Sequence, residues 1–250
     1  MTDSLDQQVV IITGASSGIG AALARACSQR GALVALAARS RERLSRVASS
    51  CPGETLVVPC DVTVADERRK LVGVVIERWG RVDILVNNAG IGYYASFEEV
   101  DEASLRALLE VDFLAVFGMT QEALRVMKPA RRGLILQVAS TGGLIAHAPS
   151  VAAYLAVKHA VVGMSRGLRR DLEGTGVRVQ VVCPHLTDTG FFEAGIGAEA
   201  MKEVADRVRG HMDTADQVAE GILRQMGSER FIVFPTDRSR SAYEHFLEVA

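Results

Sequence analysis

The segment of residues 9–30 constrains the fold most, because its pattern changes from strand to helix across one glycine-rich turn. The apolar run 9–12 enters the turn 14–20, and apolar side chains then recur at three- and four-residue intervals. This order places the free N–H groups of a helix start at the carboxyl end of a strand, where they favour an anion such as a pyrophosphate. The glycine spacing is G-x-x-x-G-x-G, not the commoner G-x-G-x-x-G, so the turn alone fits a nucleotide site or an ordinary helix cap.

Strand-like and helix-like segments alternate along the rest of the chain. Apolar runs predict strands at 9–12, 32–37, 55–58, 82–86, 134–139, 177–183 and 231–234. Helical periodicity predicts further helices at 40–50, 65–79, 104–127, 152–173 and 214–226, with a short amphipathic C-terminal end. Strands separated by helices imply right-handed crossovers. The expected fold is therefore α/β, a single domain (1–250) with a doubly wound parallel sheet of about seven strands and helices on both faces.

Composition excludes several other classes of protein. The 250 residues are 48% hydrophobic, which suffices for the core of one large domain, and the net charge is -2 with no basic block for a nucleic acid. The four cysteines have no paired metal-ligand spacing, so we expect no metal site and a reducing compartment. The N-terminus lacks the pattern of a signal peptide, and no apolar run approaches the ~18 residues of a membrane span. We expect a cytoplasmic protein.

Four motifs fall in register with these elements. Residues 13–20 read TGASSGIG, 87–90 read NNAG after a strand, Ser140 follows the next strand, and Tyr154 and Lys158 form Y-x-x-x-K at a helix start. Over essentially its whole length, the chain resembles the short-chain dehydrogenase/reductase family. The resemblance implies a Rossmann-type fold and a nicotinamide-dependent oxidoreductase that interconverts a carbonyl and a secondary alcohol by hydride transfer.

The Y-x-x-x-K pair suits this chemistry. A carbonyl that receives a hydride also needs a proton, which a tyrosine hydroxyl can supply although its unperturbed pKa is ~10. Lys158 lies one helical turn from Tyr154, so we expect its ammonium to lower the pKa of Tyr154. By the resemblance, Tyr154 is the general acid/base, Lys158 also bonds the nicotinamide ribose, and Ser140 holds the substrate oxygen. The family usually places its serine thirteen positions before the tyrosine, where Thr141 stands, so Thr141 is the rival to Ser140.

Two further positions depart from the family pattern. Asp112 stands where the family commonly has an asparagine that supports a proton relay near the lysine. An ionised aspartate only accepts hydrogen bonds, so the relay is altered or Asp112 is a structural helix residue. His185 replaces the glycine of a Pro-Gly turn near the nicotinamide, and it is either a second proton donor or a loop residue without a catalytic role, as is His147.

The end of the second strand indicates which dinucleotide binds. NAD-preferring folds usually carry an acid there for the ribose 2′-hydroxyl, but this chain has Ala38 followed by Arg39 and Ser40. An arginine can pair with a 2′-phosphate through two hydrogen bonds, and a serine can add another. We therefore expect NADP(H), with NAD(H) as the alternative if Arg39 is only a solvated loop charge.

The resemblance assigns cofactor contacts to residues at several strand ends. They are Gly14, Ser16, Ser17, Gly18, Ile19, Gly20, Arg39, Ser40, Asp61, Val62, Asn88, Ala89, Gly90, Tyr154, Lys158, Pro184 and Thr189. Asp61 would accept a hydrogen bond from the adenine amine, or it is simply an acid at a helix start. Residues 88–90 would line the cofactor mainly through their backbone.

Three loops, 92–97, 141–151 and 185–196, are expected to form the substrate pocket. Their apolar side chains favour an apolar or aromatic carbonyl or alcohol; they are Tyr93, Tyr94, Phe97, Leu144, Ile145, Phe191 and Phe192. The irregular stretch 185–210, with a helical piece near 198–208, predicts a substrate lid or, alternatively, a surface excursion. By the resemblance, helices 104–127 and 152–173 would form a homodimer or homotetramer.

Two other functions remain compatible with these motifs. A non-catalytic dinucleotide-binding sensor or scaffold could use the same fold, with Asp112 and His185 as the features that favour it. An epimerase or dehydratase could use the same cofactor chemistry, but the chain is short for the larger substrate domain that such enzymes often carry.

Overall fold

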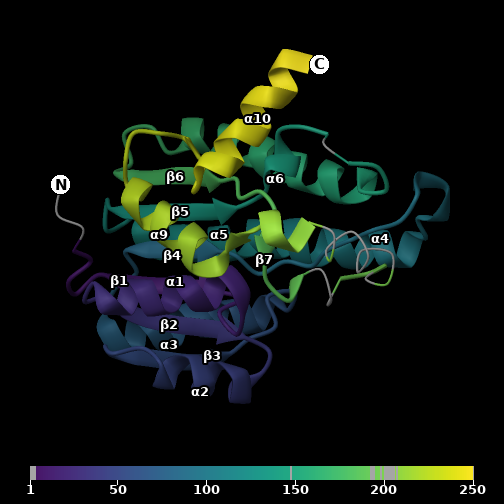
Figure 1. Ribbon diagram of the computed structural model, residues 1–250. Coiled ribbons are helices and arrows are strands. Elements are labelled where there is room, and N and C mark those ends of the chain that lie inside the picture. The colour runs from purple at the N-terminus through teal and green to yellow at the C-terminus, as the bar shows by residue number, and fades with distance from the viewer. Residues whose placement is uncertain are drawn as a thin grey trace.

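A single parallel sheet organises the molecule. The computed structural model describes residues 4–146, 148–191, 195–197, 199, 206 and 208–249. Within this part, seven parallel strands pair in the order β3-β2-β1-β4-β5-β6-β9 (Figure 1). They are β1 (Val9–Thr13), β2 (Leu33–Ala38), β3 (Thr55–Pro59), β4 (Ile84–Asn87), β5 (Gly133–Val138), β6 (Val177–Val182) and β9 (Ile232–Val233). The expected α/β fold is confirmed, and each strand boundary lies within two residues of the expected one.

Helices cover both faces of the sheet. The α-helices of the described residues are α1 (Gly18–Gln29), α2 (Arg41–Ser49), α3 (Ala65–Trp79), α4 (Glu102–Leu109), α5 (Ala115–Met127), α6 (Ala152–Asp171), α9 (Ala215–Gln225) and α10 (Asp237–Val249). Figure 1 shows α1 and α9 in front of the strands, with α5 behind them. This two-sided cover explains why β1 is buried along its whole length: Val10 and Ile12 pack in the cluster with α1 and α9, whereas Val9 and Ile11 pack in the cluster with α3 and α5.

The sheet has a point where its strand order reverses direction. From β1 the chain moves outward through β2 to β3, and then returns to the other side of β1 through β4. In open parallel sheets, ligands bind outside the carboxyl ends of the strands at such a point. The fold therefore directs attention to the turns that follow β1 and β4.

The helix expected at 104–127 is interrupted in the structure. It begins at Glu102, because the Asp101 side chain caps it by accepting a hydrogen bond from the Ser104 N–H at 2.8 Å. It then passes through a π-helical turn, Glu110–Leu114, before continuing as α5. Turns of this kind are frequent at functional sites, and this one carries the fully buried Asp112.

The C-terminal part also differs from expectation. Where a short amphipathic end was expected, α10 extends over thirteen residues and projects away from the sheet (Figure 1). Before it, β7 (Thr187–Asp188) and β8 (Asp213–Thr214) form a small second sheet that closes the base of the 185–210 segment. Most of the helical piece expected at 198–208 lies outside the described residues. Among the described helices, none is both long and apolar enough to cross a membrane.

Candidate active site

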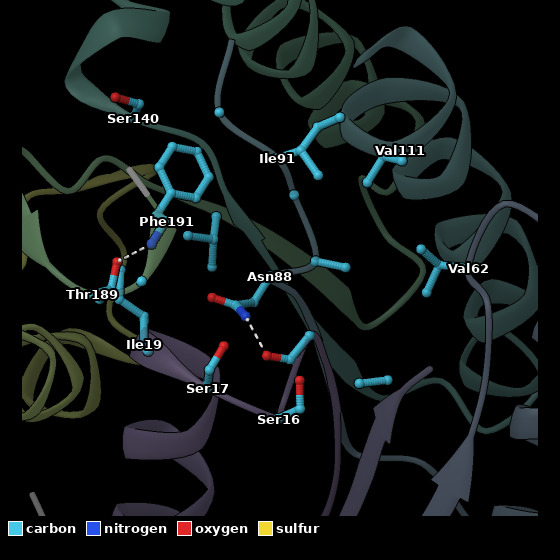
Figure 2. Close-up of a pocket in the computed structure, with 18 of the residues that line it drawn as sticks. Ser16, Ser17, Ile19, Val62, Asn88, Ile91, Val111, Ser140, Thr189 and Phe191 are labelled. Atoms are coloured by element: carbon cyan, nitrogen blue, oxygen red, sulfur yellow. Dashed lines mark hydrogen bonds between the residues drawn. The ribbon is translucent and has the colours of Figure 1, made fainter. Parts of the chain in front are cut away.

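One cavity of about 960 Å³ opens at the carboxyl edge of the sheet. We name two parts of its lining. The strand-end wall comprises Gly14, Ser16, Ser17, Gly18, Ile19, Ala38, Arg39, Ser40, Arg43, Asp61, Val62, Thr63, Asn88, Ala89 and Gly90. The loop wall comprises Ile91, Gly92, Tyr94, Ala107, Glu110, Val111, Leu186, Gly190 and Phe191. Ser140, Tyr154, Lys158, Pro184 and Thr189 also line the cavity, and Figure 2 shows members of both walls around its open centre.

Every expected cofactor residue except Gly20 therefore lies on the cavity surface. Gly20 is buried behind the turn, where an added Cβ would lie 2.4 Å from the Gly14 carbonyl oxygen and 2.6 Å from Asn88 Nδ2. Gly14 itself has a φ of +65°, a conformation that suits glycine. Gly20 thus allows the helix to approach the turn and does not line the cavity.

The amino end of α1 opens onto the cavity. Ser17 is its N-cap residue, and its side chain makes no capping hydrogen bond. The N–H groups of the first helical turn therefore keep their capacity to bind an external anion, and the helix dipole adds to the attraction. This geometry fits a pyrophosphate.

Thr13 joins the first motif to NNAG, a role that the sequence reasoning missed. Its hydroxyl oxygen accepts hydrogen bonds from the Asn88 N–H at 3.0 Å and the Ala89 N–H at 3.1 Å. Asn88 Nδ2 in turn donates to the carbonyl oxygens of Thr13, at 3.0 Å, and Gly14, at 3.3 Å. These bonds fix the turn after β1 against the turn after β4, which makes the strand-end wall a rigid surface.

Tyr154, Lys158 and Asp112 form a cluster in which Lys158 and Asp112 are buried and Tyr154 is partly exposed to the cavity. Tyr154 and Lys158 lie on α6, and the π-helical turn brings Asp112 to them. Lys158 Nζ is 2.9 Å from Asp112 Oδ2 and 5.6 Å from the centroid of the Tyr154 ring. The side chains are 7% exposed for Lys158 and 0% for Asp112, so their ion pair is shielded from water.

Lys158 acts on the pKa of Tyr154 in the expected direction, but burial outweighs it, so the pKa is raised above its usual value. Burial is the largest cause, because it disfavours the charged phenolate. Lys158 does lower the pKa of Tyr154, as does a hydrogen bond from Ser140, but Asp112 raises it. Burial also opposes the charge on Lys158, yet Asp112 and Tyr154 raise the pKa of its ammonium above the usual value.

Ser140 and Thr141 have different surroundings. The Ser140 hydroxyl is close enough to Tyr154 to lower the pKa of that tyrosine, and its oxygen accepts a hydrogen bond from the Gly142 N–H at 3.0 Å. The Thr141 hydroxyl lies 3.0 Å from His185 Nδ1, and Thr141 is fully buried. Ser140 is therefore the hydroxyl beside Tyr154, whereas Thr141 holds the imidazole that replaces the family's glycine. His147 lies outside the described residues.

The far end of the strand-end wall is basic. Arg39 and Ser40 line it as expected, and Arg43 joins them from the first turn of α2. Ser40 starts that helix by accepting a hydrogen bond from the Arg43 N–H at 3.3 Å, so Arg39 and Arg43 belong to one turn and both line the cavity. Arg39 is also close enough to contribute to the lowered pKa of Asp61, whose main cause is a hydrogen bond from Thr63.

Asp61 stands at a helix start and also lines the cavity. Its Oδ1 accepts hydrogen bonds from the N–H, at 2.9 Å, and the hydroxyl, at 2.7 Å, of Thr63. This turn leads into α3, as an acid at a helix start would do. Asp61 also lines the cavity, so its carboxylate is accessible to a ligand there.

The loop wall contains only part of the expected apolar set. Tyr94 and Phe191 line the cavity, and the Phe191 ring packs edge-on against Tyr154 with centroids 6.1 Å apart. Tyr93 instead faces inward and packs in the core beside Leu108 and Val157. The other expected members are placed differently: Phe97 is 79% exposed, Leu144 and Ile145 are packed away from the cavity, and Phe192 lies outside the described residues.

Backbone hydrogen bonds join the segment after β6 to the loop after β4. Ile196 N donates to the Gly92 carbonyl, and Tyr94 N donates to the Ile196 carbonyl, both at 2.9 Å. Thr189 accepts from the Phe191 N–H at 3.3 Å (Figure 2). These contacts bring Phe191 over the cavity beside Tyr154.

The comparisons with known proteins agree with this geometry. The family profile described as short chain dehydrogenase matches residues 8–200. The chain belongs to the short-chain dehydrogenase/reductase family. As a member of it, the protein is an oxidoreductase that acts on CH–OH and C=O groups with a nicotinamide dinucleotide. Nothing in the comparisons supports the non-catalytic sensor or scaffold.

Several curated members of the family are similar to this short-chain dehydrogenase/reductase. The granaticin polyketide synthase putative ketoacyl reductase 1 of Streptomyces violaceoruber is 39% identical over 80% of this chain and 77% of its own length. The 3-oxoacyl-acyl-carrier-protein reductase FabG of Thermotoga maritima is 33% identical, with 88% and 90% covered. The meso-2,3-butanediol dehydrogenase of Serratia marcescens is 38% identical, with 74% of each covered.

A solved member of the family shares the whole fold. The short chain dehydrogenase/reductase from Burkholderia phymatum, in complex with NAD, superposes with a TM-score of 0.89 at 25% identity. The alignment covers 100% of this chain and 96% of that one.

Proposed function

We propose that this short-chain dehydrogenase/reductase interconverts an uncharged, apolar ketone and its secondary alcohol with NADP(H). The single observation that carries the proposal is the cavity itself, which joins Arg39, Ser40 and Arg43 at one end to Ser140, Tyr154 and Lys158 further along. A dinucleotide that extends along the strand-end wall would therefore meet a basic turn at one end and a proton donor at the other.

The basic turn favours NADP(H) over NAD(H). No acid follows β2 to accept the ribose 2′-hydroxyl, because Ala38 stands there. Arg39 and Arg43 offer two guanidinium groups to a 2′-phosphate, and charge-assisted hydrogen bonds of this kind are the strong ones. The Burkholderia relative, in complex with NAD, supports a nicotinamide dinucleotide in general.

The remaining residues have defined parts in the reaction. A bound nicotinamide supplies or accepts the hydride at the substrate carbon. Tyr154 donates its hydroxyl proton to the carbonyl oxygen during reduction and takes it back during oxidation. Ser140 stabilises that oxygen by a hydrogen bond while negative charge develops on it. Lys158 would bind the nicotinamide ribose, and its ammonium group balances the negative charge of the Tyr154 phenolate.

The loop wall determines the substrate class. Tyr94, Val111 and Phe191 offer apolar surface, and Glu110 is the acid on this wall. A ketone without a carboxylate would gain from burial of its apolar part. A keto acid would face the charge of Glu110, so we expect uncharged substrates to be preferred.

Two further expectations concern movement and assembly. We expect residues 185–210 to act as the substrate lid, supported by the Ile196 contacts to Gly92 and Tyr94 and by the place of Phe191 beside Tyr154. We expect a homodimer or homotetramer, and the exposed apolar side chains of Leu114 (48%) and Phe117 (44%) are suited to such a contact. Light scattering of the purified protein measures the assembly.

The test is a substrate panel with a catalytic control. Ketones, keto acids and their alcohols are assayed with NADPH and NADP⁺ by the absorbance of the reduced cofactor. We expect turnover of apolar ketones, and a fall of about 10²–10⁴-fold in the Tyr154→Phe variant, as is typical of a lost general acid. Binding of NADPH without turnover of any compound would contradict the proposed function.

A further inference from the structure

The carboxylate of Asp112 links the loop after β4 to the catalytic helix α6. Its Oδ2 lies 2.9 Å from Lys158 Nζ, and its Oδ1 accepts a hydrogen bond from the Ile91 N–H at 2.7 Å. Asp112 also lies directly under Gly90, where an added Cβ would be 3.0 Å from Oδ2. Gly90 and Ile91 line the cavity, so the buried Asp112 side chain contacts both this part of the cavity lining and the Lys158 ammonium group.

The π-helical turn makes this placement possible. Asp112 occupies the middle of Glu110–Leu114, between α4 and α5, and has no exposed surface. A buried carboxylate costs much free energy unless it is paired. Lys158 supplies the pairing charge, since its Nζ lies within ion-pair distance of Asp112 Oδ2. Asp112 Oδ2 has no hydrogen bond of good geometry to any described residue, so this ion pair is its main compensation.

Among the described residues, few charges besides this pair act on the Tyr154 hydroxyl. The described titratable groups that affect it are Lys158 from α6, Asp112 from the π-helical turn, Cys183 after β6 and Tyr94 after β4. Burial raises the pKa of Cys183 to about 12 and raises that of Tyr94, so both are neutral at pH 7. His185 lines the same cavity but contacts Thr141.

We propose that Asp112 is a positioning residue: its buried carboxylate anchors Lys158, offsets part of the ammonium charge, and so keeps the Tyr154 proton in place at neutral pH. The inference rests on the proposed function, in which Tyr154 is the proton donor. A site in which Tyr154 keeps its proton favours carbonyl reduction.

The consequence differs for the two directions of the reaction. In reduction, the O–H bond of Tyr154 breaks and the proton passes to the carbonyl oxygen, so a retained proton keeps the acid available up to high pH. In oxidation, Tyr154 must first lose its proton to act as the base. Burial and Asp112 raise its pKa, so alcohol oxidation increases only as the pH rises into the alkaline range.

The substitution Asp112→Asn removes the charge of the side chain but keeps its shape. Asp112→Asn keeps an oxygen to accept the Ile91 N–H and removes the negative charge next to Lys158. The ammonium charge would then act more fully on Tyr154 and favour its phenolate. We expect the titration midpoint of Tyr154 to fall by about one pH unit or more, which is the usual size of the pKa shift caused by a neighbouring charge.

A spectroscopic titration measures that midpoint without any substrate. Phenolate absorbance in the near ultraviolet is followed against pH, and the curve of the Tyr154→Phe variant is subtracted from that of its parent. The measurement is made with Asp112 and with Asp112→Asn. A lower midpoint with asparagine, or ionisation of Tyr154 seen only with asparagine, supports the inference; an unchanged or higher midpoint, or no ionisation in either protein, overturns it.

Asp83→Asn is the matched control. Asp83 precedes β4 at the opposite edge of the sheet. Its carboxylate is 11% exposed, accepts a hydrogen bond from the Val9 N–H at 2.8 Å, and pairs with Arg81 and Arg132. Its substitution should lower stability without moving the Tyr154 midpoint. A merely structural role for Asp112 would give the same pattern.

A pH profile separates failure of this inference from failure of the proposed function. With the substrate found above, the rise of kcat for alcohol oxidation should move to lower pH in Asp112→Asn by the same amount as the titration midpoint. If Tyr154→Phe is inactive but the profile of Asp112→Asn does not move, the role of Asp112 is wrong and the proposed function stands. If Tyr154→Phe retains full turnover, the proposed function itself is wrong.

Discussion

The strand-end wall and the loop wall enclose one cavity but are built differently. The strand-end wall consists of tight turns that follow buried strands, and hydrogen bonds donated by Asn88 to Thr13 lock two of these turns together. The loop wall consists of side chains from longer segments, joined to each other through two backbone bonds at Ile196. We therefore expect the strand-end wall to bind the cofactor and the loop wall to select the substrate.

Among the substitutions that compare the two walls, the largest effect should come from Ser140, which lines the cavity but belongs to neither wall. Ser140→Ala should lower kcat by about 10²–10³-fold, because the substrate oxygen loses a hydrogen bond where charge develops. The Kd for NADPH should change little, since the strand-end wall is untouched. Steady-state kinetics and fluorescence titration measure the two quantities.

Thr141→Ala is the matched control for that substitution. Thr141 is buried and its hydroxyl faces His185, so its removal should affect kcat much less. If Thr141→Ala is the crippling change and Ser140→Ala is not, the assignment of the catalytic hydroxyl is wrong.

The next effect tests the rigidity of the strand-end wall. In Gly20→Ala, the new Cβ would meet the Gly14 carbonyl oxygen at 2.4 Å, and the turn must shift. We expect a loss of about 1–3 kcal/mol in the free energy of unfolding, as for other overpacked sites, together with weaker NADPH binding. Denaturant unfolding and fluorescence titration check both results.

Gly73→Ala is the control, because Gly73 lies in α3 with no atom within 4 Å of an added Cβ. It should be neutral or stabilise by up to about 1 kcal/mol through helix propensity. If both alanine variants behave alike, close packing around Gly20 does not shape the wall.

The smallest effect should come from the loop wall. Phe191→Ala removes the ring that packs edge-on against Tyr154, and an aromatic pair contributes about 0.5–1.5 kcal/mol. We expect kcat/KM for an apolar ketone to fall up to about tenfold, the kinetic equivalent of that energy, with the Kd for NADPH unchanged. A comparable loss of NADPH affinity would show that the two walls are not independent.

The same division explains what the sequence could predict. Each part of the strand-end wall follows a strand within a few residues, so local patterns around Gly14, Arg39 and Asn88 placed it correctly. The loop wall depends on the path of long segments. The sequence offered Tyr93 and Tyr94 as equals, but only the fold decides that Tyr93 packs into the core and Tyr94 faces the cavity.

The pKa shift of Tyr154 and the contacts of Lys158 also could not be predicted from the sequence, because they depend on the three-dimensional structure. The spacing of Tyr154 and Lys158 suggested a lowered pKa for the tyrosine, but it contained no measure of burial. The contact between Asp112 and Lys158 joins positions 46 residues apart, and it depends on a π-helical turn that helical periodicity does not reveal.

The choice of cofactor tests the central claim most directly. The ratio of kcat/KM for NADPH to that for NADH is measured for the parent protein, for Arg39→Ala and for Arg41→Ala, an exposed arginine of the same turn that does not line the cavity. We predict that the parent prefers NADPH, that Arg39→Ala lowers the ratio by about tenfold or more through loss of a charge-assisted bond, and that Arg41→Ala changes it little. A parent that prefers NADH, with a ratio unaffected by Arg39→Ala, would contradict the account.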